Sequence, residues 1–440
     1  MPDHAETDVL LTLAIALAAG VMLVAVARKV NFSAIAFLLL GGIVLGPGGL
    51  GVVKPDSLGP ILRPVVSLAV GLILFEGGLS LNLSGYRSAS RIIMKLLTLG
   101  VLTTWLATAL AIRWLLGYSA SFSLLAASLV IVTGPTVIVP LLKRIKIQQP
   151  LHSILHWEGV LIDPIGVFVA ILCFEWISGL GAQSAATNFA LRLLTGLFLG
   201  GVGGLVLAWL IRRRVIHEDL VDVIPVAVAV LVFGLGEVLM NESGLLATAT
   251  AGLVLGASQP TELQQIRRFK ASITDLLIGF LFIVLAARLR IEQFAEFGWP
   301  GLGVVLLILF AVRPLNVVVS TLGEPINWRQ RLFLAWVAPR GIVAASMSSL
   351  FALSLQERNV PHARFLETFT YSVIVATVLL HGLTAGWVAG WLGLRRPVAT
   401  GWLIVGAHRF AREVGATISR VAKVPVLLLD LNPKSVREAR

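Results

Sequence analysis

Apolar runs of about 20 residues recur along almost the whole chain and limit its fold more than any other feature. An α-helix rises about 1.5 Å per residue, so about 20 residues cross the roughly 30 Å of hydrocarbon in a bilayer. We count thirteen such runs and expect an all-α polytopic membrane protein. The runs lie near 9–27, 32–52, 62–81, 93–116, 120–142, 152–178, 189–211, 221–240, 243–258, 272–291, 299–322, 332–354 and 368–392.

The composition supports membrane integration. The chain is 57% hydrophobic and 13% charged, whereas soluble domains carry about 25% charged residues. The first nine residues contain acids but no Lys or Arg, so we interpret the first apolar run as a retained span rather than a secretory signal. The single cysteine, Cys173, excludes an intramolecular disulfide.

The basic residues follow the connections between the runs. With the N-terminus outside, the inner connections hold eighteen Lys and Arg residues and the outer ends hold eight. This asymmetry is the positive-inside pattern, so the net charge of +12 indicates orientation and not a nucleic-acid partner. We expect a multi-pass protein of the bacterial inner membrane, surrounded by lipid, with its C-terminus in the cytoplasm.

The runs form two halves of opposite orientation, one to six and eight to thirteen, with the seventh as a linker. The fifth run of the first half reads VTGPTVIVP (132–140), and the fifth of the second half reads VAPRGIVAAS (337–346). Both contain Gly and Pro, and proline removes a backbone donor and breaks a helix. Paired interruptions in an inverted repeat indicate a binding site near the middle of the membrane.

Two acids lie well inside the sixth run, within HWEGVLIDPIGV (156–167). A carboxylate at the bilayer centre costs about 2.5–3.5 kcal/mol, so such residues are functional by default. Glu158 and Asp163 are separated on a helix by about 140° of rotation and about 7.5 Å of rise. They therefore face different surroundings, and we expect two different roles.

Arg313 and Arg340 are the two basic residues that lie well inside apolar runs, away from the run ends. One of them should neutralise Glu158, because an unpaired buried charge is far more costly than a paired one. Asp163 is then free to hold either a proton or a cation, in competition, since burial favours the neutral form of a carboxylic acid. This competition is the physical basis of a proton-coupled cation exchanger.

These motifs, together with two further segments, resemble a known family, the monovalent cation:proton antiporters of the sodium/hydrogen-exchanger branch. The resemblance extends over nearly all of 10–392. It implies thirteen helices in a transmembrane antiporter domain (1–396), a homodimer, and crossed unwound fifth and twelfth spans. It also implies a dimerisation part (spans one to three and eight to ten) and a moving core (four to six and eleven to thirteen). The matching segments are FEGGLSLNL (75–83), VTGPTVIVPLL (132–142), WEGVLIDPIGV (157–167), ESGLLA (242–247) and APRGIVAAS (338–346).

The resemblance also assigns roles. It implies that Asp163 binds the ion and the proton, that Glu76 can approach the ion, and that the backbone carbonyl of Thr133 is a ligand. It implies a structural ion pair of Glu158 with Arg340 or Arg313. Gly134 and Gly159 complete the set of ion-site positions.

Three of the family's polar side chains are missing. Ile162 replaces an asparagine, Gly159 a serine and Gly134 an aspartate. A site with fewer oxygen ligands selects less strongly for a small, strongly hydrated ion. Potassium is therefore a candidate beside sodium. If Asp163 alone exchanges one proton for one monovalent cation, transport should be electroneutral.

A second motif lies in residues 397–440. GWLIVGAHRFA (401–411) and VLLLDLN (426–432) fit the start of a dinucleotide-binding unit, with Gly406 in the turn and Asp430 at the ribose-binding position. His408 replaces the middle glycine, so we expect a truncated regulatory domain and no bound cofactor.

Other functions remain open. One is a potassium-selective efflux system or a cation channel gated by the cytoplasmic nucleotide-binding domain; a channel requires a filter such as TVGYG, which the sequence lacks. Another is an organic-anion carrier that uses Arg313 or Arg340 as a ligand. The sequence contains no metal-ligand cluster, nucleophile–base pair or phosphate loop that indicates an enzyme.

Overall fold

The computed structural model describes most of the chain. The described residues are 4–30, 34–80, 90–134, 137–138, 141–142, 145–177, 182–241, 243–259, 263–289, 291–396, 401–422, 424–432 and 437. Parts of the quoted motifs, namely 81–83, 135–136, 139–140 and Glu242, lie outside them, as do the basic residues Arg87, Lys143, Arg144 and Arg290.

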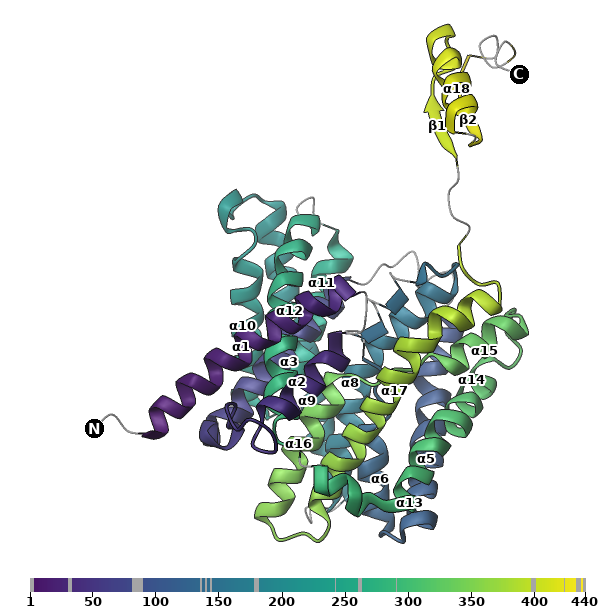
Figure 1. Ribbon diagram of the computed structural model, residues 1–440. Helices are drawn as coiled ribbons and strands as arrows, with labels where there is room; N and C mark the ends of the chain where they lie inside the picture. The colour runs from purple at the N-terminus through teal and green to yellow at the C-terminus, as the bar shows by residue number, and fades with distance from the viewer. Residues whose placement is uncertain are drawn as a thin grey trace. The chain divides into compact units, whose positions relative to one another are not determined.

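The chain divides into two compact units, Met1–Leu394 and Arg395–Arg440. The first unit is built from helices throughout its described residues (Figure 1). Its α-helices are α1 (His4–Val30), α2 (Ala34–Leu45), α3 (Leu62–Ser80), α5 (Val101–Leu116), α6 (Ala120–Leu129), α8 (Leu151–Ile177), α9 (Ala182–Arg212), α10 (Ile224–Leu239), α11 (Ser243–Ser258), α12 (Leu263–Ala286), α13 (Ile291–Leu307), α14 (Arg313–Thr321), α15 (Trp328–Trp336), α16 (Ile342–Glu357) and α17 (Ala363–Trp391). Short 3₁₀ turns lie at Pro55–Ile61 and Glu218–Leu220.

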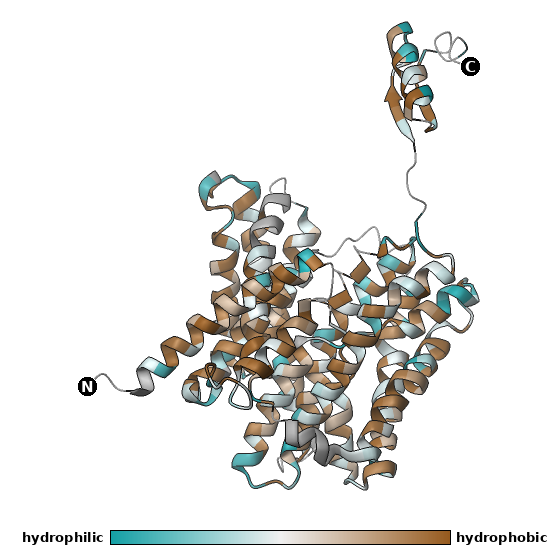
Figure 2. Cartoon of the chain, viewed as in Figure 1, coloured by the Kyte–Doolittle hydropathy of each residue, from teal (hydrophilic) through white to brown (hydrophobic). Residues whose placement is uncertain are grey.

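Many of these helices can cross a membrane. Six are long and apolar enough, and the bent pair Pro55–Ile61 and Pro64–Leu79, with a break of 82°, brings the number to seven among the described residues. Five shorter apolar helices accompany them. Figure 2 shows hydrophobic residues along most of these helices. Many large hydrophobic side chains of α1, α5 and α9 are exposed, which suits contact with lipid. The chain is thus a multi-pass helical membrane protein, and the number thirteen stays a prediction.

Irregular backbone occurs at matching places in the two predicted halves. Leu96–Gly100, in the fourth apolar run, and Ile308–Val312, in the eleventh, are both π-helical turns. The fifth run is non-helical from Val130 to Gly134, including the segment 131–134, and the twelfth is non-helical from Val337 to Gly341. π-turns and breaks change the rotation of the residues that follow them, and they concentrate at functional sites.

Glycines allow the long α9 to approach α11 closely. Gly196, Gly200 and Gly204 recur every four residues on one side of α9. A Cβ at Gly196 would lie 2.8 Å from the Cβ of Leu246, and one at Gly204 would lie 2.8 Å from the Ala251 carbonyl oxygen. This glycine series therefore serves close helix packing.

The second unit is a small parallel βαβ arrangement. Strand β1 (Trp402–Val405) pairs in parallel with β2 (Val426–Leu429), and α18 (Arg409–Ala422) connects them. Gly415 of α18 lies against Ile404 and Leu428, so the helix covers one face of the two-stranded sheet.

Two neighbouring glycines of α9 provide a test of this packing. Gly200→Ala would place a methyl group over the Ala247 carbonyl oxygen and 2.6 Å from the Thr250 Cβ, whereas Gly201 has open space around it. We expect Gly200→Ala to destabilise the protein by about 1–3 kcal/mol, the usual cost of overpacking. Thermal unfolding of the purified protein in detergent measures the effect. Gly201→Ala is the control and should be neutral or slightly stabilising, by up to about 1 kcal/mol. Equal behaviour of the two variants would contradict the close packing.

Candidate functional site

The two helix interruptions meet in space. The backbone N–H of Gly134 donates a hydrogen bond to the carbonyl oxygen of Pro339 at 3.1 Å. A Cβ added to Gly341 would overlap the Cα of Gly134. The two broken segments therefore approach more closely at Gly341 than a residue with a side chain would permit, which explains the glycine at that position.

Breaking a helix inside a membrane frees backbone carbonyl groups that need new donors. Arg340, only 2% exposed, supplies them from the second interruption. Its Nη1 donates to the carbonyl oxygens of Ile131 and Val132 at 2.8 and 3.3 Å. Its own backbone N–H donates to Thr377 Oγ1 at 3.1 Å. A cation at the end of α6 also balances the negative pole of that helix.

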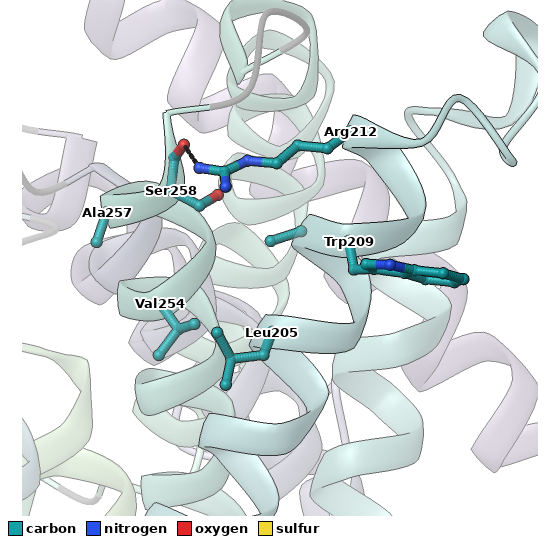
Figure 3. A pocket seen from close by; sticks show the side chains of 7 residues that line it. Leu205, Trp209, Arg212, Val254, Ala257 and Ser258 are labelled. Atoms are coloured by element: carbon teal, nitrogen blue, oxygen red, sulfur yellow. Dashed lines mark hydrogen bonds between the residues drawn. The ribbon is translucent and has the colours of Figure 1, made fainter.

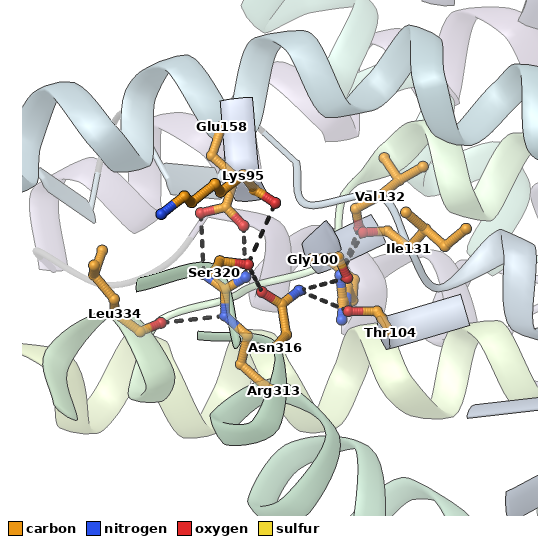
Figure 4. Close-up of polar contacts among 11 residues, drawn as sticks. Lys95, Gly100, Thr104, Ile131, Val132, Glu158, Arg313, Asn316, Ser320 and Leu334 are labelled. Atoms are coloured by element: carbon orange, nitrogen blue, oxygen red, sulfur yellow. Dashed lines mark hydrogen bonds and ion pairs between the residues drawn. The ribbon is translucent and has the colours of Figure 1, made fainter. Parts of the chain in front are cut away.

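Glu158 of α8 is neutralised by Arg313. The guanidinium donates twice, from Nη1 to Oε1 at 2.5 Å and from Nη2 to Oε2 at 3.0 Å (Figure 4). A third bond runs from Arg313 Nε to the Leu334 carbonyl oxygen at 3.1 Å. Both side chains are almost fully buried, so the paired geometry is what makes two charges tolerable here. Of the two arginines considered from the sequence, Arg313 forms the ion pair and Arg340 binds the backbone.

Asn316, one turn after Arg313, holds the two π-containing spans together. Its Nδ2 donates to the Gly100 carbonyl oxygen at 2.9 Å and to Thr104 Oγ1 at 2.7 Å. Its Oδ1 lies 3.4 Å from the hydroxyl group of Ser320. Our sequence reasoning missed this network. An amide three residues after a buried arginine, in an otherwise apolar run, was the available signal.

Asp163 differs from these groups. Its side chain is 1% exposed, and neither carboxylate oxygen has a hydrogen-bond partner among the residues that the structure describes. The fully buried hydroxyl group of Thr133 likewise lacks one within the described part of the chain. A buried carboxylate without donors is costly unless a proton or a cation occupies it.

Asp163 shares one side of α8 with a residue that contacts the first interruption. Gly166 follows one turn later on the same side of α8, and a Cβ there would overlap a methyl group of Val132. Arg340 binds the carbonyl group of the same Val132. The side of α8 that carries Gly166 therefore packs against the first interruption, and Asp163 lies one turn earlier on that side.

Glu76 and Gly159 complete the expected positions. Glu76 lies on α3 and is half-buried. The next residue, Gly77, faces α8, because a Cβ there would lie 3.5 Å from Val160. Gly159 is buried in α8 between Glu158 and Val160 and offers no side-chain oxygen.

In the βαβ unit, the turn after β1 is bound by the side chain of Asp430. Gly406 adopts a φ of 104°, which favours glycine. The Asp430 carboxylate accepts hydrogen bonds from the backbone N–H groups of Asn432 at 2.9 Å and Ala407 at 2.7 Å. These bonds lower the pKa of Asp430, so the acid stays ionised and ties β2 to the turn. Within the described residues, no three His, Cys, Asp or Glu side chains gather to hold a metal ion.

Comparison with known proteins assigns this chain to a family. A family model described as "Sodium/hydrogen exchanger, transmembrane" matches residues 13–391. The chain belongs to the sodium/hydrogen exchanger family. The resemblance read from the sequence motifs is confirmed at this level.

Several members of the sodium/hydrogen exchanger family are similar to this chain. Na(+)/H(+) antiporter 1 of Methanocaldococcus jannaschii is 25% identical over 387 residues, covering 84% of this chain and 89% of that protein. K(+)/H(+) antiporter NhaP2 of Shewanella sp. strain MR-4 is 26% identical over 377 residues, covering 83% of this chain and 63% of that protein. The chain therefore spans less than two thirds of the second relative.

A solved structure of the family has the same fold. The sodium proton antiporter MjNhaP1 from Methanocaldococcus jannaschii at pH 8 superposes with a TM-score of 0.77 at 22% identity. The match covers 88% of this chain and 99% of that chain. The polytopic helical fold expected from the sequence is confirmed.

The buried ion pair predicts a measurable coupling. Glu158→Gln leaves the Arg313 guanidinium buried and unpaired, which should cost about 3–5 kcal/mol. The double variant Glu158→Gln with Arg313→Gln removes both charges, so it should be less destabilised than the sum of the single changes. A double-mutant cycle from unfolding in detergent measures the difference.

The control is the exposed pair of Lys54 and Asp8, whose charged atoms lie 3.0 Å apart. Asp8→Asn should change stability by no more than about 1 kcal/mol, because water screens this pair. If Glu158→Gln lowers the free energy of unfolding no more than Asp8→Asn does, the buried ion pair does not stabilise the protein.

Proposed function

We propose that this protein exchanges a monovalent cation, sodium or potassium, for protons across the membrane. The observation that carries the proposal is Asp163, a buried carboxylate without a partner among the described residues. It lies on α8 three residues before Gly166, where an added Cβ would overlap a methyl group of Val132 in the interrupted segment. The named activities of the similar antiporters support the same conclusion.

The proposed mechanism is competition for one carboxylate. A proton on Asp163 removes its negative charge and excludes a cation, and a bound cation excludes the proton. Thr133 would contribute backbone or hydroxyl oxygen, and Glu76 on α3 would approach the ion path. Glu158, Arg313 and Arg340 keep the surrounding charge balanced and do not exchange ions.

Alternating access completes the proposal. The spans that carry Asp163 and the two interruptions would move as a core against a dimeric scaffold in the bacterial inner membrane, with the N-terminus outside. One proton exchanged for one monovalent cation makes each cycle electroneutral.

Potassium deserves equal weight with sodium as the transported ion. Gly134, Gly159 and Ile162 provide no side-chain oxygen at three positions near the proposed site. A larger, less strongly hydrated ion loses less when fewer ligands replace its water shell. The similar K(+)/H(+) antiporter supports this possibility.

Asp163→Asn tests the proposal directly. The amide cannot release a proton or offer a negative charge, so cation-dependent proton flux should fall to the background level. The measurement is proton flux in everted vesicles, with sodium, potassium or lithium added in turn. Asp163→Glu is the conservative control and should retain part of the activity. Flux at the wild-type rate in Asp163→Asn would exclude a single exchanging carboxylate at this position.

Competition also fixes the sign of the pH dependence. At acidic pH the proton occupies Asp163, so the cation must displace it before binding. We expect the KM for the cation to rise about tenfold per pH unit in this range and to level off at alkaline pH, since one proton is released for each cation bound. Rates at saturating cation should change much less. A KM that stays constant across the acidic range would show that proton and cation use separate sites.

A further inference from the structure

A groove outside the ion site opens where the close contact of α9 and α11 ends. Gly196, Gly200 and Gly204 keep the two helices together, and the next two positions at the same spacing are Ala208 and Arg212. From this point the helices enclose an open cavity of about 590 Å³ (Figure 3). Its lining consists of Leu205, Ala208, Trp209, Arg212, Val254, Ala257 and Ser258.

The groove combines an apolar wall with a basic end. Arg212 Nη2 donates to the carbonyl oxygen of Ser258 at 2.7 Å, so the guanidinium lies across the end of the groove (Figure 3). This bond uses one of the five N–H donors of the arginine. Arg213 and Arg214 follow directly and are exposed. None of the seven lining residues is acidic, and the nearby Asp219 lies 3.3 Å from His217.

An apolar stripe leads along α9 to this basic end. Phe198, Val202, Leu205 and Trp209 follow one another at spacings of four, three and four residues, which places them on one side of the helix. All four are exposed, Phe198 by 69% and Trp209 by 54%. Tryptophan is enriched where hydrocarbon meets the headgroups, so the stripe runs from the hydrocarbon to the membrane surface.

We propose that this groove binds an anionic phospholipid. The phosphate group would accept hydrogen bonds from Arg212 and attract Arg213 and Arg214, and one acyl chain would lie along Leu205 and Val254. A soluble phosphate would satisfy the arginines but not the apolar wall. A zwitterionic lipid would satisfy the wall but bring its own cation toward the arginines.

The test compares lipids on the purified protein in detergent. We expect native mass spectrometry to show phosphatidylglycerol bound in preference to phosphatidylcholine, and phosphatidylglycerol to raise the unfolding temperature. Ala257→Phe fills the groove at an exposed position and should weaken phosphatidylglycerol binding at least tenfold. The double variant Arg213→Gln with Arg214→Gln preserves the hydrogen bond from Arg212 to Ser258. It should also weaken the binding of phosphatidylglycerol.

Arg113→Gln is the matched control, because Arg113 is also an exposed arginine in the last turn of a helix, α5, but lies outside the groove. It should bind phosphatidylglycerol like the wild type. Equal binding of the two lipids, undiminished binding in Ala257→Phe, or equal stabilisation by glycerol phosphate without acyl chains would each overturn the proposal. These readouts do not depend on transport, so they stand apart from the test of Asp163.

Discussion

The site depends on one constraint, which is that backbone groups freed inside a membrane must find partners within the protein. The interruptions at 131–134 and 337–341 free such groups at the same place. The bond from Gly134 to Pro339 satisfies one donor, and Arg340 satisfies two carbonyl groups at the end of α6. The second interruption thus supplies the residue that repairs the first, and each broken segment depends on the other.

This repair explains why two arginines lie in the interior. Arg340 is engaged by carbonyl dipoles, so Glu158 needs its own cation, and Arg313 provides it in a two-bond geometry. The π-helical turn Ile308–Val312 directly precedes Arg313 and adds rotation to the residues after it. Asn316, in the next turn, fixes the same span against Gly100 and Thr104. Asp163 remains as the buried acid of α8 to which no described residue donates.

Much of this arrangement could be predicted from the sequence because it follows from local chemistry. The pairs of glycine and proline predicted both breaks, and two carboxylates about 140° apart on one helix predicted two different surroundings. The choice between Arg313 and Arg340 could not be predicted, since it depends on how far the π-turn rotates its span and on which carbonyl groups the break exposes. The contact of Gly134 with Gly341 depends on long-range packing, and the sequence reveals only that both are small. Asn316 was missed because an isolated amide has no period or motif.

Charge conservation connects this geometry to the proposed exchange. In the proposed mechanism the pair of Glu158 and Arg313 stays neutral and fixed, and Arg340 keeps its charge against carbonyl dipoles. The occupant of Asp163 is then what changes the charge of the site. A proton and a monovalent cation each cancel the same single negative charge. The two loaded forms therefore carry equal charge through the membrane in opposite directions, and the membrane potential does equal and opposite work on them. A second exchanging carboxylate would remove this equality. The engagement of Glu158 by Arg313 is consequently the structural condition for electroneutral exchange in the proposed mechanism.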